Sequence, residues 1–321
     1  MYAKNQNIRK RRQFQEYLNT IYNLPYWENS FFVNEIYGKL QGSLLLTGAG
    51  TSLDDEIENI KKIKDQIIII ACDRSFKTLY QNNIIPEFVA TVDFSPLVEK
   101  FFDFKFSPSD TILIYDPRVS NKILNKFQRS MLMDCHNPFF YHFKEKIREH
   151  EHIHGWGSIT NAMYGLASQL GCKRIGLVGM DFCYYHNTHC KGNGNDYLHP
   201  ARLLYMKDEF GNICRTTKLF LKYRENMIGL VEKFKIDTYN LTKKGLDICN
   251  RLDFLNFPLN IYKQNINELY IEIQKLKKHV LLFPITDFHK IYYYIKSFSD
   301  EINEDFMRRI MELIIKRCIC G

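Results

Sequence analysis

The sequence lacks the long apolar runs, internal repeats and low-complexity segments that would indicate a membrane, solenoid or disordered protein. No run approaches the roughly 20 apolar residues that a helix needs to cross a bilayer. The basic N-terminus, MYAKNQNIRKRRQF, is not followed by an apolar signal region. We therefore expect a folded, cytoplasmic protein.

A disulfide framework and a regular metal site are also missing. The nine cysteines are odd in number and have no framework spacing, which favours a reducing compartment and small buried side chains. Metal-ligand residue types gather at Cys183, His186, His189 and Cys190. Adjacent His189 and Cys190 do not comfortably share a tetrahedral zinc ion, and no CxxC pair accompanies them. We therefore expect no metal site.

What is present fits one α/β core with helical additions. The chain has 321 residues, of which 45% are hydrophobic and 14% aromatic, and its formal net charge is +8. Basic clusters at Arg9–Arg12 and Lys275–Lys278 would attract nucleic acid, an anionic membrane surface or phosphorylated sugars, although solvated faces are the plainer interpretation. Because no RNA-binding pattern of aromatic and basic residues occurs, we expect no nucleic-acid partner, whereas peripheral membrane contact is compatible with this charge.

The chain is organised around Gly42–Asp55, GSLLLTGAGTSLDD. A short apolar run leads into a glycine turn, and Thr51 and Ser52 are placed to cap the helix that follows. Backbone N–H groups and the positive end of a helix dipole meet at such a turn, so a nucleotide phosphate is its natural ligand. The turn is neither GxGxxG nor a Walker loop, and an ordinary strand-to-helix turn remains the alternative.

Strands and helices then alternate, which predicts a parallel, doubly wound sheet. The predicted strands are 43–46, 66–72, 88–92, 111–115, 173–178 and 236–241. Asp73, Asp93 and Asp116 each follow a strand, where a loop residue faces the ligand crevice. For one such aspartate a helix cap is an equally good interpretation, but three in register favour function.

A second glycine-rich loop opens a second helix within HGWGSITNAMYGLASQLGCKRIGLVGMDFCYYH, residues 154–186. Ser158 or Thr160 can cap that helix, Gly171 ends it, and the next strand leads to Asp181. Two loop-to-helix anion sites exceed what a scaffold needs.

The whole pattern predicts an α/β fold, a Rossmann-like doubly wound and mostly parallel sheet with N-terminal helices and a helical C-terminal subdomain. We place the boundaries at 1–40, 41–255 and 256–321. The N-terminal part is expected to hold a helix broken at Leu24-Pro25 and a second helical segment over Phe31–Leu40. The C-terminal part is expected to be cut by Pro284.

Five segments in order resemble the motility accessory factor (Maf) type glycosyltransferases and the related 6-hydroxymethylpterin diphosphokinase MptE-like proteins. They are GAGTSLDD, IIPEFVATVDFSP, GSITNAMYGLASQLGCKRIGLVGMDF, DEFGNICRTTKLFLKYRENM and YNLTKKGLDI, and they span about residues 30–250. GAGTSL and ITNA...GMDFCY are more loosely similar to the CstII-type bacterial sialyltransferases. The chain departs from these patterns at Thr51, where proline is usual, and at Asn161, where those sialyltransferases have a nucleotide-contacting serine.

The resemblance implies a transferase that moves a nonulosonic acid of the sialic, pseudaminic or legionaminic type from a CMP-sugar donor. The acceptor would be a flagellin-like protein or a surface glycan, and a homo-oligomer is compatible with it. No tightly bound cofactor is expected. The alternatives are a pyrophosphokinase acting on a pterin alcohol with ATP, in which Asp93, Asp116 or Asp181 would hold Mg²⁺, and a non-catalytic binding protein that keeps the fold.

In the transferase, the donor phosphate would lie against the 48–52 and 157–160 turns. The residues expected to bind the nucleotide are Gly48, Gly50, Thr51, Ser52, Asp73, Asp93, Asp116, Gly157, Ser158, Thr160, Asn161 and Tyr184. His199 is the first candidate for the general base, ahead of His186 and His154, because histidine suits proton transfer at neutral pH. Asp181 is the second catalytic candidate, or it holds the site together.

Overall fold

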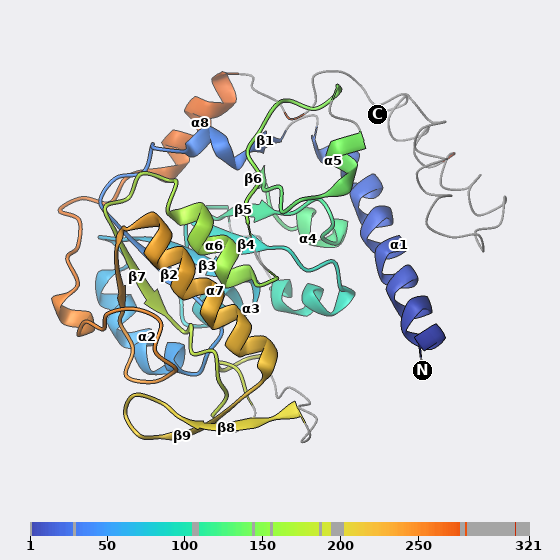
Figure 1. Cartoon of the computed structure of the whole chain (residues 1–321). Helices are drawn as coiled ribbons and strands as arrows, with labels where there is room; N and C mark the ends of the chain where they lie inside the picture. The colour runs from blue at the N-terminus through green and yellow to red at the C-terminus, as the bar shows by residue number, and fades with distance from the viewer. Residues whose placement is uncertain are drawn as a thin grey trace.

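A parallel sheet of eight strands forms the centre of the molecule (Figure 1). In the order in which they lie side by side, the strands are β1 (Phe31–Phe32), β6 (Ser130–Leu132), β5 (Ile112–Tyr115), β4 (Phe88–Thr91), β3 (Ile68–Cys72), β2 (Ser43–Thr47), β7 (Arg174–Val178) and β10 (Asp237–Asn240). All neighbouring pairs are parallel. The structure, a computed structural model, describes residues 2–27, 30–104, 109–142, 145–154, 157–185, 188–193, 202–276, 280 and 312. The predicted α/β class with a Rossmann-like parallel sheet is confirmed.

The strand order reverses direction beside β2. From β2 the chain builds β3 to β6 in sequence toward one edge, whereas β7 and β10 are added on the other side of β2. At such a reversal the loops after two neighbouring strands separate, which opens a crevice at their carboxyl ends. The glycine turn after β2 therefore lies at the point in the sheet where a ligand is expected.

Helices cover both faces of the sheet. The α-helices are α1 (Tyr2–Trp27), α2 (Ser52–Ile63), α3 (Asp73–Gln81), α4 (Asn121–Leu124), α5 (Pro138–His142), α6 (Ile159–Ala167), α7 (Lys218–Phe234) and α8 (Ile266–Lys275). Short 3-10 helices occupy Val33–Ile36, Pro96–Phe102 and Phe254–Asn256. Leu45 packs with residues of α1 to α5 on one face, whereas Leu44 and Leu46 pack with those of α6, α7 and α8 on the other. This two-residue alternation within an unbroken apolar strand produces a three-layer arrangement, with α6 and α7 in front of the sheet in Figure 1.

The N-terminal part corrects the prediction of a second helical segment over Phe31–Leu40. That segment begins instead as strand β1, which pairs with Met131 and Leu132 at the edge of the sheet, and continues as a 3-10 helix. Both phenylalanine side chains are fully buried, so burial at the sheet edge outweighs the helical spacing. Helix α1 also runs through Pro25 to Trp27, whose buried ring packs against the rings of Phe139 and Phe140.

The structure also contains a hairpin that was not predicted from the sequence and part of the predicted C-terminal helices. An antiparallel hairpin of β8 (Leu204–Lys207) and β9 (Ile213–Thr216) follows α6 and β7 in the chain and stands apart from the parallel sheet. Of the C-terminal segment, α8 is described and packs on the sheet through Leu269 and Ile273, whereas Pro284 lies outside the described residues. None of the helices in the described part of the chain combines the length and apolar character needed to cross a membrane.

Candidate active site

A cavity of about 920 Å³ opens at the carboxyl ends of the strands. The loops after β2, β3, β4, β5, β6 and β7 line it, together with the N-terminus of α6 and side chains from α1 and α7. The predicted site residues that line it are Gly50, Asp73, Asp93, Gly157, Ser158, Thr160, Asp181 and Tyr184. Five others, Gly48, Thr51, Ser52, Asp116 and Asn161, do not line it. The cavity thus brings together residues that lie more than 130 positions apart in the sequence.

The N-terminus of α2 binds a carboxylate of the chain itself. Asp181 accepts hydrogen bonds from the backbone N–H of Ser52 (3.0 Å) and from the Ser52 hydroxyl. The same hydroxyl accepts a bond from Gly179 N (3.2 Å). Burial raises the pKa of Asp181, and the two bonds from Ser52 oppose that shift. Asp181 therefore occupies, from within the fold, much of the anion site that the glycine turn creates.

This arrangement explains the glycines of the turn. A Cβ on Gly50 would lie 2.4 Å from the carboxylate carbon of Asp181, and one on Gly48 would lie 2.4 Å from the carbonyl oxygen of Gly179. The prediction that Thr51 and Ser52 cap α2 is wrong. The Thr51 side chain makes no capping bond, and the Ser52 hydroxyl donates to Asp181 instead. The Thr51 hydroxyl is buried without a partner. Close backbone approach, which only glycine permits, lets the β2 and β7 loops share this carboxylate.

The N-terminus of α6 is arranged differently and faces the cavity. Gly157 has a φ of +81°, which reverses the chain just before the helix. Ser158 makes no capping bond to the helix, and its hydroxyl instead pairs with that of Thr160 at 2.8 Å. All three residues line the cavity. The first turn of α6 therefore directs its N–H groups and the positive end of its dipole toward the cavity.

An aromatic wall, consisting of Tyr184, Phe220 and Tyr223, stands beside that helix end. The rings of Tyr184 and Phe220 are stacked with centroids 4.9 Å apart, and Tyr223 follows at 6.4 Å. Asn161 connects the wall to α6 by donating its amide to the Tyr223 carbonyl at 3.1 Å, while its own side-chain oxygen is buried without a partner. A flat ring system and an anion can thus be bound side by side.

The three strand-end aspartates have different roles. Asp73 and Asp93 line the cavity. Burial raises the pKa of Asp73 to about 6, against a bond from Arg74 N and the charge of Arg74, and the charge of Asp93 adds to the rise. Asp116 is fully buried outside the cavity, where it holds Arg118 through two bonds of 2.7 and 2.9 Å. Asp116 therefore orients a guanidinium that does line the cavity.

Most of the charged residues that line the cavity were not predicted from the sequence. The cations that line it are Arg12, Arg74, Lys100 and Arg118, and the histidines are His136, His189 and His154, of which His154 was a candidate for the general base. Proximity to strand ends could have indicated Arg74, which directly follows Asp73, and Arg118, which comes two residues after Asp116. No local pattern indicated Arg12, because α1 reaches the cavity only through tertiary packing. His199 and His186 lie outside the described residues.

The metal hypothesis for Cys183, His189 and Cys190 finds no support in the geometry of the described residues. The Cys190 thiol lies against α3, where it accepts a bond from the Thr78 hydroxyl at 3.1 Å. Cys183 is instead hydrogen-bonded to the thiol of Cys214. Burial raises the pKa of Cys190 to about 12, so its thiol is neutral. His189 lies in the cavity, with Nδ1 3.3 Å from the Ala49 carbonyl.

Comparison with known proteins gives a family and a fold. Residues 18–187, just over half of the chain, match the family described as 6-hydroxymethylpterin diphosphokinase MptE-like. The fold is similar to that of a MAf glycosyltransferase from Magnetospirillum magneticum AMB-1, with a TM-score of 0.66 and 14% identity over 96% of this chain and 54% of that one. The chain thus spans about half the length of that protein. The expected likeness to Maf-type and MptE-like proteins is confirmed.

Two further comparisons add little. The sialyltransferase CstII from Campylobacter jejuni, solved with the substrate analogue cytidine-5'-monophosphate, matches with a TM-score of 0.29 and 15% identity over 80% of this chain and 98% of that one. A score this low supports no argument. No curated protein sequence matches the chain.

Proposed function

The chain belongs to the 6-hydroxymethylpterin diphosphokinase MptE-like family, and we propose that it is a glycosyltransferase that moves a nonulosonic acid from a CMP-linked donor to a protein or glycan acceptor. The observation that carries the proposal is the open N-terminus of α6 beside the aromatic wall. The fold, which is that of a MAf glycosyltransferase, is consistent with it.

The donor phosphate is proposed to lie at the first turn of α6. Asp181 already engages Ser52 at the start of α2, so a second anion there would meet a like charge. The start of α6 has no side-chain cap and faces the cavity. Arg74, whose guanidinium lies over the Phe101 ring at 4.9 Å, supplies positive charge to the same cavity.

The cytosine is proposed to stack on the aromatic wall. Gly157 and Tyr223 are in close contact, since a Cβ on Gly157 would lie 3.1 Å from the Tyr223 ring. A nucleotide phosphate at α6 would therefore have an aromatic face within reach of its base. Stacking on such a face contributes about 1–3 kcal/mol per base.

Transfer requires stabilisation of the departing CMP and removal of a proton from the acceptor. The α6 dipole opposes the charge that grows on the phosphate as the bond to the sugar breaks. His199 remains the proposed base. Among the described residues we add His189, because its Nδ1 must donate to the Ala49 carbonyl, which makes Nε2 the basic nitrogen of the neutral ring.

Binding of CMP tests the proposal directly. Isothermal titration should show that CMP binds to the wild type and that Phe220→Leu, which removes the stacked ring but keeps an apolar side chain, weakens binding by about 5- to 100-fold. Leu219→Ala is the matched control, because Leu219 neighbours Phe220 on α7 but is 56% exposed and does not line the cavity. Equal affinity of the wild type and Phe220→Leu would refute the stacking site, and no binding of any cytidine nucleotide would refute the proposal.

A second candidate is the pyrophosphokinase that the family description suggests. Asp73 and Asp93, which face the same cavity, are the acidic residues placed to hold Mg²⁺ on ATP phosphates. Asp116 and Asp181, which the sequence also suggested, are engaged by Arg118 and Ser52. Among the described residues, Asp73 and Asp93 have no third ligand-type side chain within metal-binding distance. If the protein is a pyrophosphokinase, it should bind ATP tightly in the presence of Mg²⁺. The glycosyltransferase should instead bind CMP without a metal ion.

A further inference from the structure

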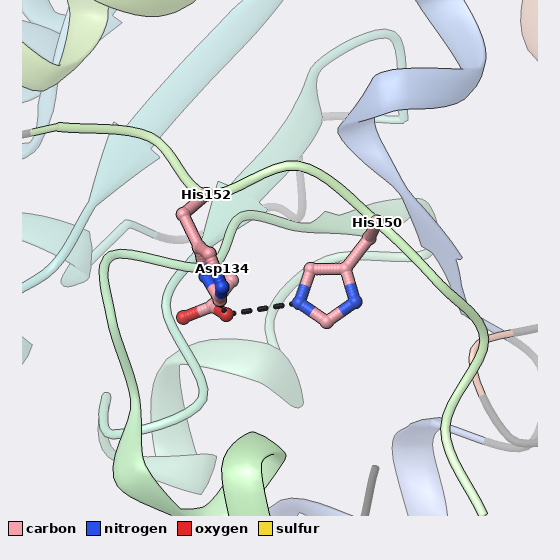
Figure 2. Close-up of side chains that lie close together, drawn as sticks. All are labelled: Asp134, His150 and His152. Atoms are coloured by element: carbon pink, nitrogen blue, oxygen red, sulfur yellow. Dashed lines mark hydrogen bonds and ion pairs between the residues drawn. The ribbon is translucent and has the colours of Figure 1, made fainter. Parts of the chain in front are cut away.

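Two histidines and an aspartate converge beside the end of β6, outside the residues discussed so far. Asp134 comes two residues after β6, and its carboxylate is fully buried. One of its oxygens, Oδ2, lies 2.9 Å from His150 Nε2 and 2.6 Å from His152 Nδ1. Figure 2 shows both rings directed at this carboxylate. The His150 side chain is 9% exposed and that of His152 is 49% exposed, so the group is closed on one side and open to solvent on the other.

The hydrogen-bond pattern around His150 calls for a cation. Its other nitrogen, Nδ1, lies 2.9 Å from the carbonyl oxygen of Arg148. A carbonyl only accepts, so Nδ1 carries the proton of the neutral ring. In that tautomer Nε2 presents a lone pair to a carboxylate oxygen that also presents lone pairs. Either a second proton or a metal ion between these atoms removes the repulsion.

The geometry suits a metal ion. The three ligand atoms all lie within 4.8 Å of one another. Zinc bonds of about 2.0–2.1 Å place neighbouring ligand atoms of a tetrahedron about 3.3 Å apart, so the two observed distances need to open by less than 1 Å. Two imidazoles and one carboxylate are also a ligand set of zinc sites that keep one position open, whereas Mg²⁺ and Ca²⁺ prefer oxygen ligands.

The surroundings hold the ligands in place. The bond from His150 Nδ1 to the Arg148 carbonyl is the outer-sphere contact that metal-binding histidines usually make. The His150 ring stacks on Phe32 at 3.9 Å, and the second carboxylate oxygen of Asp134 accepts a bond of 2.7 Å from Asn137 N. These contacts fix one ring and the carboxylate before any ion binds, which reduces the ordering that binding requires.

We propose that Asp134, His150 and His152 bind a divalent transition metal ion, with Zn²⁺ the best fit and a water molecule at the fourth position on the solvent side. The ion ties the segment 145–154 to the end of β6. The His136 ring stacks on His152 at 4.8 Å and bonds to His154 at 3.0 Å. His136 and His154 both line the cavity, so the ion helps to position the part of the cavity lining that these two histidines form.

The test is zinc binding by the full chain, purified without a histidine tag and stripped with a chelator. In competition with a chromophoric chelator, the wild type should bind one Zn²⁺ per chain, and His152→Ala and Asp134→Asn should each weaken binding by about 100-fold or more. The matched control is His154→Ala, which removes a histidine of the same segment that is not a ligand and should leave the affinity within about threefold. Far-ultraviolet circular dichroism checks that the variants are folded, and His152, being half exposed, is the replacement least disruptive to packing.

Two results would overturn the proposal. One is the absence of zinc binding by the wild type; nitrogen NMR shifts should then show two protons on the His150 ring, because a proton supplies the cation in place of the metal. The other is equal loss of zinc in His154→Ala and His152→Ala, because the three-ligand assignment would then be wrong. Neither result depends on the donor sugar or the nucleotide.

Discussion

At the scale of single residues, Asp181 shows how a local anion site can be filled by the chain itself. Its carboxylate bonds Ser52 at the start of α2, and its backbone oxygen accepts from Leu246 N at 2.9 Å. Because Gly50 is in close contact with this carboxylate, the side chain introduced by Gly50→Val would displace Asp181 and not only block a bound phosphate. The geometry therefore favours a positioning role for Asp181, which joins the loops after β2 and β7.

Asp73 gives a pH-dependent prediction. Burial raises its pKa from 3.8 to about 6, so the folded state favours the protonated carboxyl. The stability that this carboxyl contributes is complete below about pH 4 and is lost as the pH rises through about 6. Asp73→Asn, which can keep the bond from Arg74 N, should therefore stabilise the fold at pH 7.5 by up to about 3 kcal/mol and have little effect at pH 4.

Thermal unfolding of both proteins across pH 4–8 measures this difference. Asp93→Asn serves as the control, since Asp93 faces the same cavity but is exposed to solvent. A gain for Asp73→Asn that is the same at every pH would show that packing, and not the charge of the carboxylate, is responsible.

At the scale of elements, the two helices that begin at the cavity differ in what binds their N-termini. Helix α2 receives Asp181 from the neighbouring loop, whereas α6 begins after Gly157 with no side-chain cap. Both helices start after glycine turns and look alike in sequence. Because β7 lies beside β2, Asp181 binds the N-terminus of α2 and links the two loops. The N-terminus of α6 is therefore the better phosphate site.

Two glycines in the helical layer predict opposite effects of the same substitution. Gly229 lies within α7 with no atom within 4 Å of an added Cβ, so Gly229→Ala should stabilise the protein by about 0.5–1 kcal/mol. Gly171 follows α6 with a φ of +101°, and its Cβ would lie 2.8 Å from the backbone carbon of Gly38. Gly171→Ala should therefore destabilise by about 1–3 kcal/mol.

Urea unfolding of the two variants beside the wild type tests the pair. Because neither glycine lines the cavity, CMP affinity should change in neither variant. Destabilisation by Gly229→Ala would mean that α7 packs more tightly at that position than the structure indicates.

At the scale of the whole molecule, the reaction itself is the decisive prediction. Incubation with a panel of CMP-linked nonulosonic acids, and separately with ATP, Mg²⁺ and a pterin alcohol, should release CMP and no AMP, as read by mass spectrometry. In the active reaction, loss of the general base should lower turnover by about 10²- to 10⁴-fold with donor affinity nearly unchanged. Comparison of His199→Ala with His189→Ala identifies which histidine has that role. Release of AMP would favour the pyrophosphokinase.

The order of strands and helices could be predicted from the sequence because it depends on local signals. Apolar runs such as 44–46 and 175–178 are buried on both faces of a parallel sheet, and glycine turns at Gly48 and Gly157 end or begin elements. The exceptions lay at the edge, where Phe31 and Phe32 form a strand because their burial depends on Met131 and Leu132, about 100 positions away.

The sequence by itself determined the α/β class, the parallel sheet and the two glycine turns at its carboxyl end, because backbone conformation and burial follow from neighbouring residues. Only the tertiary structure decided which side chains meet there. Tertiary packing brings Asp181 to the start of α2, pairs Asp116 with Arg118 and places Asp134 beside two histidines. Such contacts join residues from separate loops, and their electrostatic energies depend on distances and burial that no local pattern specifies.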